Sequence, residues 1–466
     1  MTLPAGTRVR VGHEVWRHEQ GAVLVGGTPL RLLRLSDRAA AYLLDDVVTV
    51  SDAQSTALAD RLVAAGVAHP DPESLPAVPA SDLTVVIPTH GRDAEVDALL
   101  AGLAGLRVIV VDDATPHPAS ARLRAVVDRH GQMLLRLPRN VGPASARNAG
   151  LARVTTPLVA FVDSDVVTTA DDLLVLARQF ADPGLALAAP RVVGVAEERM
   201  SWVTRYENAR ASVDLGGRPA LVRPRSRVSW LSSTCLIARR AALGDGFTPG
   251  MRVAEDVDLV WRLAETPWRV RYEPRTLVHH RHRAGVGAWL ARKAFYGTGA
   301  AALAPRHPQS IPPAILRPWA LGVLVALLAG RRWSIPVAAA IALGETWRLR
   351  RRTRRVSASW LLPLRLVGAG VVSALTQASA LALRHWWPVA AVAGVLSRRA
   401  RGIVAVMAVV DAFIEHRRVH ADLDLARFTL ARRLDDVAYG AGVWYGCLRR
   451  GSLAALRPDL RPDPNR

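Results

Sequence analysis

The chain has 466 residues, a formal net charge of +21 and two cysteines, Cys235 and Cys447. This length exceeds one ordinary core, so we expect two or three structural units. Two cysteines exclude a disulfide framework and fit a reducing compartment, and no apolar secretory signal is expected at the start. The excess of arginine indicates an anionic partner, which composition leaves open among phosphates, acidic lipids and nucleic acid.

Residues 1–75 predict a small basic unit. The run LRLLRL predicts a strand, and SDRAAAYLL and SDAQSTALADRLVAAG predict two helices with Ser36 and Ser51 as their N-caps. A proline-rich stretch, PDPESLPAVP, follows and leads into a linker that we place at residues 76–81.

Residues 82–300 predict an α/β domain. Four buried strands alternate with helical segments, and each strand is an almost continuous apolar run: LTVVIPT, VIVVDDA, LVAFVDSD and LALAAPRVVG. This pattern is typical of a mostly parallel sheet covered on both faces, in other words of a Rossmann-like fold. Ligands of such sheets bind at the carboxyl ends of the strands, so the residues that follow each strand are candidates for a site.

The first two strand ends carry groups suited to a nucleotide. Pro88 bends the backbone, so Thr89 and Arg92 can face a nucleotide, although this segment alone also fits a simple turn. Asp112 and Asp113 can accept hydrogen bonds from a base or a ribose, or can cap a helix instead.

The next segments suit a diphosphate and a cation. Gly142 lies in a turn of small residues that opens a helix, whose amides and Arg147 would lie near a diphosphate. The alternative for Arg147 is packing against the sheet. Asp163 and Asp165 form an Asp-x-Asp sequence, and alternate strand residues point the same way, so both carboxylates can share one Mg²⁺ or Mn²⁺ ion.

A later helix begins with Glu255 and Asp256. Acidic residues there complement the helix dipole, but Asp256 can also act as a general base, with Glu255 beside it. In the same helix, Trp261 and Arg262 are candidates for the acceptor side.

The segment HHRHR at residues 279–283 adds basic groups after another strand. We expect His279, as the first histidine, to complete a metal shell, and Arg281 and Arg283 to bind phosphate. The alternative is a basic strand end that faces solvent.

Residues 301–466 predict a helical, hydrophobic, arginine-rich region. Apolar segments occupy residues 311–330, 333–347, 360–383 and 386–414, and the third is long enough to cross a bilayer. The second is short and flanked by arginines on both sides, which favours an interfacial or re-entrant position. We expect association with an anionic membrane at its cytoplasmic face; a cytoplasmic protein whose helices pack on the catalytic domain or on a twin subunit is the alternative.

The motifs IPTHGR, VDDAT, NVGPASARNAGL, FVDSD and EDVDLVWRL, in this order within residues 82–283, resemble the family 2 glycosyltransferases. The resemblance implies a GT-A fold, inversion at the sugar, a UDP-sugar donor, a divalent cation at Asp165 and Asp256 as catalytic base. It also implies that Asp112 or Asp113 contacts the base and ribose. The Gln-x-x-Arg-Trp element of processive synthases does not occur, which favours transfer of one or a few sugars.

Within the family, the layout is most similar to the glycosyltransferases of mycofactocin systems, and the first 75 residues look like a winged-helix peptide-recognition module. This similarity implies a hexose, such as glucose, added to a small peptide-derived redox cofactor. A lipid acceptor such as a polyprenyl phosphate is the first alternative, and a nucleic-acid-binding protein, supported by charge alone, is the second. No strand is followed by Gly-x-Gly-x-x-Gly, which argues against a dinucleotide oxidoreductase.

Overall fold

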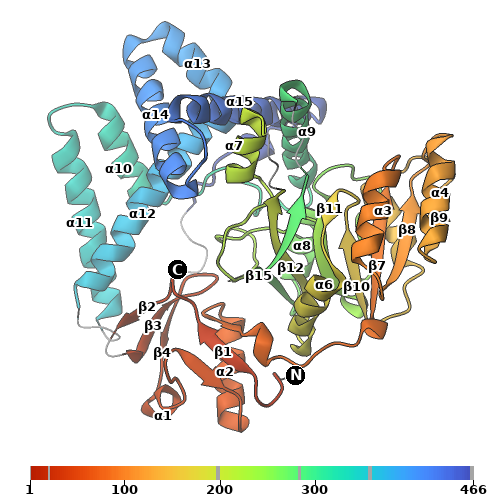
Figure 1. The fold of residues 1–466 in the computed structure, drawn as a ribbon. Helices are drawn as coiled ribbons and strands as arrows, with labels where there is room; N and C mark the ends of the chain where they lie inside the picture. The colour runs from red at the N-terminus through yellow and green to blue at the C-terminus, as the bar shows by residue number, and fades with distance from the viewer. Residues whose placement is uncertain (1, 19–20, 196–199, 282–284, 355–358, 462–466) are drawn as a thin grey trace. The chain divides into compact units, whose positions relative to one another are not determined.

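The computed structural model describes residues 2–18, 21–195, 200–281, 285–354 and 359–461 (Figure 1). The chain forms two compact units. The first contains Met1–Glu198 and Arg210–His282, and the second contains Arg199–Ala209 and Arg283–Arg466.

The N-terminal part of the first unit contains more strand than its sequence predicts. Two antiparallel three-stranded sheets form, in the orders β5–β1–β6 and β2–β3–β4. Their strands and the two accompanying helices are β1 (Arg8–Val11), β2 (Trp16–His18), β3 (Val23–Gly26), β4 (Arg31–Arg34), α1 (Asp37–Ala40), β5 (Val47–Thr49), α2 (Ala53–Ala64) and β6 (Ala68–Pro70).

The two predicted N-terminal helices differ from expectation at their ends. Ser36 caps α1 as predicted, but α1 is a single turn. It is followed by Asp45 and Asp46, whose φ angles of 46° and 70° turn the chain into β5. The second helix is capped by Asp52 and not by Ser51, because the Asp52 carboxylate accepts from the backbone amide of Ser55.

The central sheet of the first unit is mixed and runs in the order β11–β15–β12–β14–β10–β7–β8–β9, with β13 paired to β15. Its strands are β7 (Leu83–Thr89), β8 (Arg107–Asp112), β9 (Met133–Arg136), β10 (Leu158–Val162), β11 (Val166–Val167), β12 (Leu185–Gly194), β13 (Ala220–Leu221), β14 (Cys235–Arg239) and β15 (Arg269–His280). The sheet is mixed rather than mostly parallel, because β14, which the sequence pattern did not reveal, enters antiparallel between β10 and β12.

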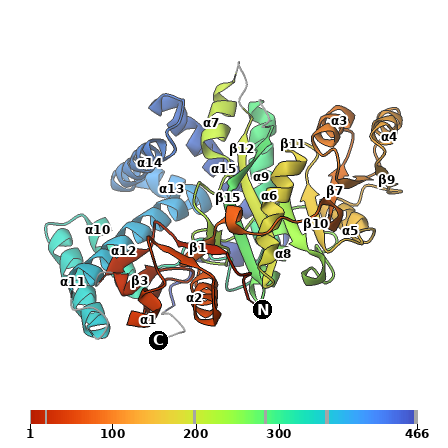
Figure 2. The ribbon, with the colours of Figure 1, turned by 60° about the horizontal axis from the view of Figure 1, so that its bottom comes forward.

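Helices cover both faces of this sheet. They are α3 (Asp93–Gly102), α4 (Ala119–Arg129), α5 (Pro143–Leu151), α6 (Ala170–Ala177) and α8 (Glu255–Ala264). Figure 2 shows α3 and α4 on one side of β7 and β8 and α5 on the other. Alternating strand residues account for this: Val85 and Ile87 join the core with α3 and α4, whereas Val86 faces α5. A Cβ on Gly150 of α5 would lie 2.4 Å from Val86, so only glycine allows this close packing.

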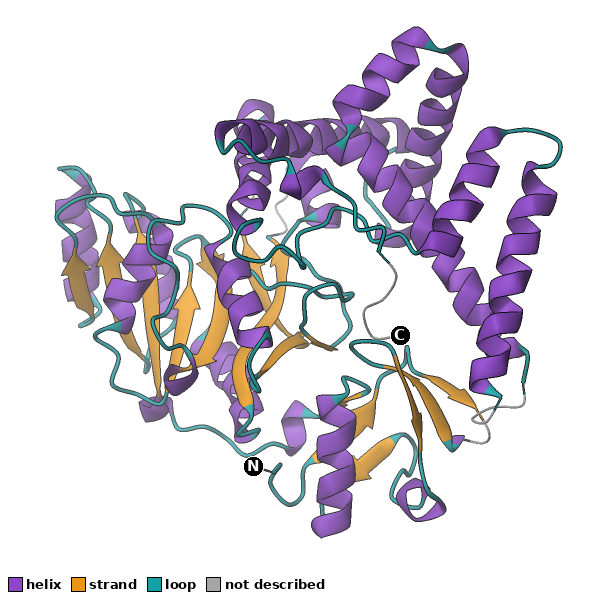
Figure 3. Ribbon diagram, turned by 180° about the vertical axis from the view of Figure 1, so that it is seen from behind, coloured by secondary structure: helices purple, strands orange, loops and turns teal. Residues whose placement is uncertain are grey.

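The second unit is a group of helices joined by loops, as Figure 3 shows. They are α7 (Trp202–Arg210), α9 (Val286–Leu303), α10 (Pro318–Ala329), α11 (Ser334–Thr353), α12 (Leu361–Ala380), α13 (Trp387–Leu396), α14 (Arg398–Val419) and α15 (Leu425–Arg449). Within the described residues, one continuous helix, Leu361–His385, is long and apolar enough to cross a membrane. Small residues bring α9 against α15, since a Cβ on Gly442 would lie 1.8 Å from the Ala294 carbonyl oxygen.

Candidate active site

The carboxyl ends of β7, β8 and β10 lie at one edge of the central sheet. Thr89 ends β7 and is in register with Asp112, the last residue of β8, while Asp163 directly follows β10. Because β7 is parallel to both β8 and β10, the three side chains share that edge. The structure therefore brings together Thr89 and Asp163, which lie 74 positions apart in the chain.

The two aspartates after β8 have different environments. Both carboxylate oxygens of Asp113 accept backbone hydrogen bonds, from Val141 at 2.8 Å and from Gly142 at 2.9 Å. Asp113 thus holds the turn that precedes α5, in which Gly142 has a φ of 86°. The Asp112 carboxylate accepts from the Thr115 amide through Oδ1 only, and its Oδ2 lies 3.8 Å from Arg136 Nε.

Two buried oxygens at this edge have unused hydrogen-bonding capacity. Among the described residues, neither Thr89 Oγ1 nor Asp112 Oδ2 has a hydrogen-bond partner, although both side chains are buried. Buried polar atoms are normally paired, and an unpaired one is costly. Both oxygens can therefore accept hydrogen bonds from a bound molecule. Pro88, predicted to bend the backbone, lies within β7 in register with Val111 of β8.

Arg147 connects two carboxylates from distant parts of the chain. Its guanidinium donates to Asp163 Oδ1 at 2.6 Å and to Glu255 Oε1 at 2.9 Å, and it is 3% exposed. It also lies over the ring of Phe247. Arg147 therefore neutralises two carboxylates, and its contacts are not those predicted for a group that faces a diphosphate directly.

Asp165 pairs with Arg92 and with the second histidine of the 279–283 cluster. His280 Nε2 lies 3.5 Å from Asp165 Oδ1, and Arg92 donates to Asp165 Oδ2. Although burial opposes ionisation, the His280 and Arg92 contacts hold the pKa of the Asp165 carboxyl well below its usual range. Asp165 is therefore an anion at neutral pH.

Of the two adjacent histidines, His280 and not the predicted His279 lies beside Asp165. His279 is exposed and pairs through its backbone with Val167, whereas His280 is half-buried and reaches Asp165. The reason is the two-residue period of β15, which points adjacent side chains to opposite faces. The prediction had chosen the histidine by its order in the chain instead of by its face.

Asp256 is held at the start of α8 by backbone amides. The Ser233 amide donates to Oδ2 at 3.1 Å and the Val257 amide to Oδ1 at 2.8 Å. Burial, together with the neighbouring charge of Glu255, raises the pKa of the Asp256 carboxyl to about 7. A carboxylate with this pKa can take up a proton at neutral pH, which is what a general base does. Ser233 is a contributor that sequence patterns gave no means to find.

Neighbouring strands link Asp256 to the Asp-x-Asp segment. The Asp163 amide donates to the Thr234 carbonyl at 2.9 Å, and the residue before Thr234 donates to Asp256. Arg147 ties Asp163 to Glu255 through a second route. The carboxylates of residues 163 and 256 therefore belong to one cluster.

The backbone is strained beside two of these carboxylates. Ala254, just before Glu255, has a φ of 62°, and Ala114, just after Asp113, has a φ of 61°. A non-glycine residue in the left-handed region costs free energy, and such positions concentrate at functional sites. The strain sets the direction in which the chain leaves each carboxylate.

The predicted acceptor-side residues are used within the fold. Trp261 is 5% exposed and its Nε1 donates to the Ser229 carbonyl, while Arg262 pairs with Asp258 and donates to the Gly246 carbonyl. These contacts differ from those predicted for residues that face an acceptor. The Arg281 amide donates to the Asp165 carbonyl. Arg283, the second predicted phosphate ligand, lies outside the described residues.

The edge offers carboxylate oxygens to a divalent cation, but the described residues do not form a complete set of metal ligands. Among the described residues, no group of three or more histidine, cysteine, aspartate or glutamate side chains is arranged to hold a metal ion. Asp163 is engaged by Arg147 through Oδ1, and its side chain is 30% exposed. Carboxylate oxygens suit Mg²⁺ or Mn²⁺ chemically, provided that the remaining ligands come from diphosphate and water.

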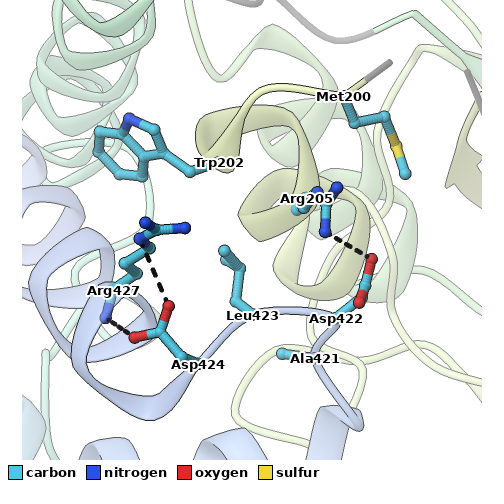
Figure 4. A pocket seen from close by; sticks show the side chains of 8 residues that line it. All are labelled: Met200, Trp202, Arg205, Ala421, Asp422, Leu423, Asp424 and Arg427. Atoms are coloured by element: carbon cyan, nitrogen blue, oxygen red, sulfur yellow. Dashed lines mark hydrogen bonds and ion pairs between the residues drawn. The ribbon is translucent and has the colours of Figure 1, made fainter. Parts of the chain in front are cut away.

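A separate cavity of about 630 Å³ lies within the second unit (Figure 4). It is lined by Met200, Trp202, Arg205, Ala421, Asp422, Leu423, Asp424 and Arg427. Both arginines are paired with aspartates, Arg205 with Asp422 at 3.2 Å and Arg427 with Asp424 at 3.4 Å. The cavity contains none of the carboxylates described above.

Comparison with known proteins is consistent with this geometry. Residues 84–247 match the model of the family Glycosyl transferase family 2. The chain is 41% identical to the pre-mycofactocin glycosyltransferase of Mycobacterium tuberculosis (strain H37Rv), over 98% of this chain and 99% of that protein. It is 33% identical over 200 residues to an uncharacterized glycosyltransferase of Mycobacterium bovis, covering 42% of this chain and 86% of that one.

Among solved structures, a mannosyltransferase of Pyrobaculum calidifontis in complex with GDP-Man and Mn²⁺ is similar, with 20% identity and a TM-score of 0.39 over 66% of this chain and 88% of that one. The full-length sequence similarity to the mycobacterial protein is the decisive finding. The chain belongs to glycosyl transferase family 2, and it is a glycosyltransferase with a GT-A-like α/β domain and a helical C-terminal region.

Proposed function

We propose that this glycosyltransferase transfers a hexose, glucose in the first instance, from a UDP-sugar to pre-mycofactocin, with inversion of the anomeric centre. The acceptor is the one in the name of the relative that is 41% identical over almost the whole chain. The observation that carries the mechanism is the joining of Asp163, Glu255 and Asp256 in one cluster at the open edge of the sheet.

Asp256 is the proposed catalytic base. It removes the proton of an acceptor hydroxyl as that oxygen forms a bond to the anomeric carbon, while the bond from that carbon to the diphosphate oxygen breaks. UDP leaves with the bonding electron pair, and the proton stays on the carboxyl of Asp256. The pKa of about 7 of the Asp256 carboxyl suits this proton transfer near neutral pH.

The remaining residues have positioning roles in this proposal. Thr89 Oγ1 and Asp112 Oδ2 receive hydrogen bonds from the nucleoside, since both are buried without a hydrogen-bond partner among the described residues. Asp113 and Gly142 shape the turn beside them. Arg147 holds Asp163 and Glu255 in place through two ion pairs, and the charge of Glu255 adds to the effect of burial on the pKa of Asp256.

We further propose that Asp165 and Asp163 hold a Mg²⁺ or Mn²⁺ ion, with His280 in place of His279 as the nearby imidazole. When bound, the cation neutralises the negative charge that develops on the leaving diphosphate. The chain's own contribution is an Asp165 that His280 and Arg92 keep ionised. The peptide-recognition role of residues 1–75 stays a prediction.

The test offers the protein pre-mycofactocin and a polyprenyl phosphate side by side as acceptors, with UDP-glucose and Mn²⁺. We expect mass spectrometry to detect hexose increments on pre-mycofactocin with the parent protein and with Glu265→Gln, a control on an exposed residue just past α8, and none with Asp256→Asn. Transfer only to a polyprenyl phosphate would overturn the proposed acceptor and favour the lipid alternative. Equal transfer by Asp256→Asn would overturn the proposed base.

A further inference from the structure

Two helical hairpins of the second unit turn at neighbouring positions. Residues 330–335 contain the turn between α10 and α11 and the start of α11, and residues 394–401 contain the turn between α13 and α14 with the adjoining helix ends. Arg399 joins them, because its guanidinium donates to the Leu328 carbonyl at 2.7 Å and to the Ala329 carbonyl. We name these two segments together the twin-turn patch.

The twin-turn patch is strongly basic. Its sequences, GRRWSI and GVLSRRAR, contain five arginines and no acidic residue. Among the described residues, no carboxylate lies within ion-pair distance of Arg331, Arg332 or Arg398, and all three are exposed. Elsewhere in the second unit, arginines such as Arg432 pair closely with aspartates. The charge of the patch is therefore available to an external anion.

The same patch exposes large apolar side chains. Val395 and Leu396 are each 80% exposed, Ile335 is 74% exposed and Trp333 is 49% exposed. Single exposed apolar residues are ordinary, but a group of them beside like charges marks an interaction surface. Exposed valine, leucine and isoleucine next to arginine suit the boundary between lipid acyl chains and phosphate headgroups.

We infer that the twin-turn patch docks on an anionic phospholipid surface, with its apolar side chains entering the acyl boundary and its arginines binding lipid phosphates. A second copy of the chain fits poorly, because five arginines would face five arginines. One helix of each hairpin, α10 or α13, is too short to cross the bilayer. At 1.5 Å per residue, α10 and α13 are about 18 Å and 15 Å long, against a hydrocarbon core of about 30 Å.

This inference does not depend on which acceptor receives the sugar. It assigns the membrane contact to two turns, in contrast to the single apolar helix Leu361–His385. The side of the membrane stays a prediction.

Vesicle co-sedimentation of the full chain tests the inference. We expect binding to vesicles that contain phosphatidylglycerol, weak binding to pure phosphatidylcholine, and a loss of binding at high salt. The pair Arg331→Gln and Arg332→Gln should weaken binding to the anionic vesicles roughly 25-fold, from about 1 kcal/mol for each arginine near the surface. The pair Val395→Asn and Leu396→Asn should weaken it by about tenfold or more.

Matched controls lie on exposed residues of the first unit. Arg124→Gln with Arg153→Gln, and Leu30→Asn, should leave vesicle binding unchanged. A fluorescent label at Leu396→Cys gives a second readout, since both native cysteines are buried. Its emission should shift to the blue on anionic vesicles, whereas a label at Leu30→Cys should not respond.

Three results would overturn the inference. One is unchanged vesicle binding in both patch variants together with a silent Leu396 label. Another is equal binding to neutral and anionic vesicles. The third is a dimer in solution that the patch variants abolish, which would assign the surface to a second copy.

Discussion

Both units of the molecule bury arginine or lysine against carboxylates, but in different surroundings. In the first unit, Arg147 joins Asp163 to Glu255 at the carboxyl edge of a sheet. In the second unit, Lys293 lies 2.9 Å from Glu207 and 3.4 Å from Asp435, with Arg384 also 3.5 Å from Asp435. Burial raises a carboxyl pKa in each, that of Asp256 in the first and that of Asp436 in the second.

The difference between the two networks lies in their position in the fold. The sheet edge carries the buried Thr89 Oγ1, which has no hydrogen-bond partner among the described residues, and a carboxylate, Asp256, with a pKa of about 7. The helical network lies on helix faces and connects α7, α9 and α15. A buried ion pair with a shifted pKa is therefore weak evidence for a site by itself, and its place at the ends of parallel strands is the stronger evidence.

The largest effect should come from Asp256→Asn. Loss of the base should lower kcat by about 10² to 10⁴-fold, because an amide cannot accept the hydroxyl proton. Donor affinity, measured by calorimetry, should stay near that of the parent. The control Glu265→Gln should retain full activity. A reduction in kcat of less than threefold in Asp256→Asn would contradict a catalytic role for the sheet-edge network.

Arg384→Met breaks the helical network and should act on stability. Leaving Asp435 and Asp436 with fewer cations should lower the free energy of unfolding by about 3 kcal/mol. Arg427→Met is the control, since its pair with Asp424 is exposed and should contribute about 0–1 kcal/mol. Denaturant unfolding measures both. If Arg384→Met instead reduced kcat without a change in stability, the helical network would be catalytic.

Asp165→Asn tests the metal part of the proposal. It should reduce Mn²⁺-dependent donor affinity at least tenfold, as expected when a metal ligand loses its charge. Donor titrations with Mn²⁺ and with a chelator provide the measurement, and the exposed Asp171→Asn is the matched control. Metal-dependent affinity equal to that of the parent would exclude Asp165 as a metal ligand.

The smallest effects should separate two threonines of β7. Thr89→Val should weaken donor binding by about two- to tenfold, the value of one hydrogen bond, with little change in stability because Thr89 Oγ1 has no partner. Thr84→Val should do the reverse, since Thr84 Oγ1 accepts from Thr156 at 2.8 Å inside the core. Donor affinity and thermal unfolding are measured for both variants. A loss of stability without a loss of donor affinity in both would contradict the role of Thr89 in donor binding.

Much of the sheet edge could be predicted from the sequence, because short apolar runs followed by polar residues define the ends of strands. Thr89, Asp112 and Asp163 come together for this reason. The antiparallel β14 could not be anticipated, since its five residues, CLIAR, carry no distinctive pattern. His280 was missed because the choice between adjacent histidines depends on which face of β15 is buried.

Roles that depend on tertiary contacts also could not be predicted from the sequence. Arg147 follows a turn that suits a phosphate, yet its guanidinium is occupied by Asp163 and Glu255, and the second of these lies 108 residues away. Trp261, predicted on the acceptor side, is a core residue. The twin-turn patch depends on Arg399 joining two segments about 70 residues apart, which no local pattern shows.

The pH dependence of kcat/KM tests most directly whether Asp256 is the base. Since a carboxyl must be ionised to accept a proton, transfer should rise about tenfold per pH unit below a pKa of about 7 and level off above it. A profile that is flat between pH 5 and pH 8, with full transfer at pH 5, would contradict the account.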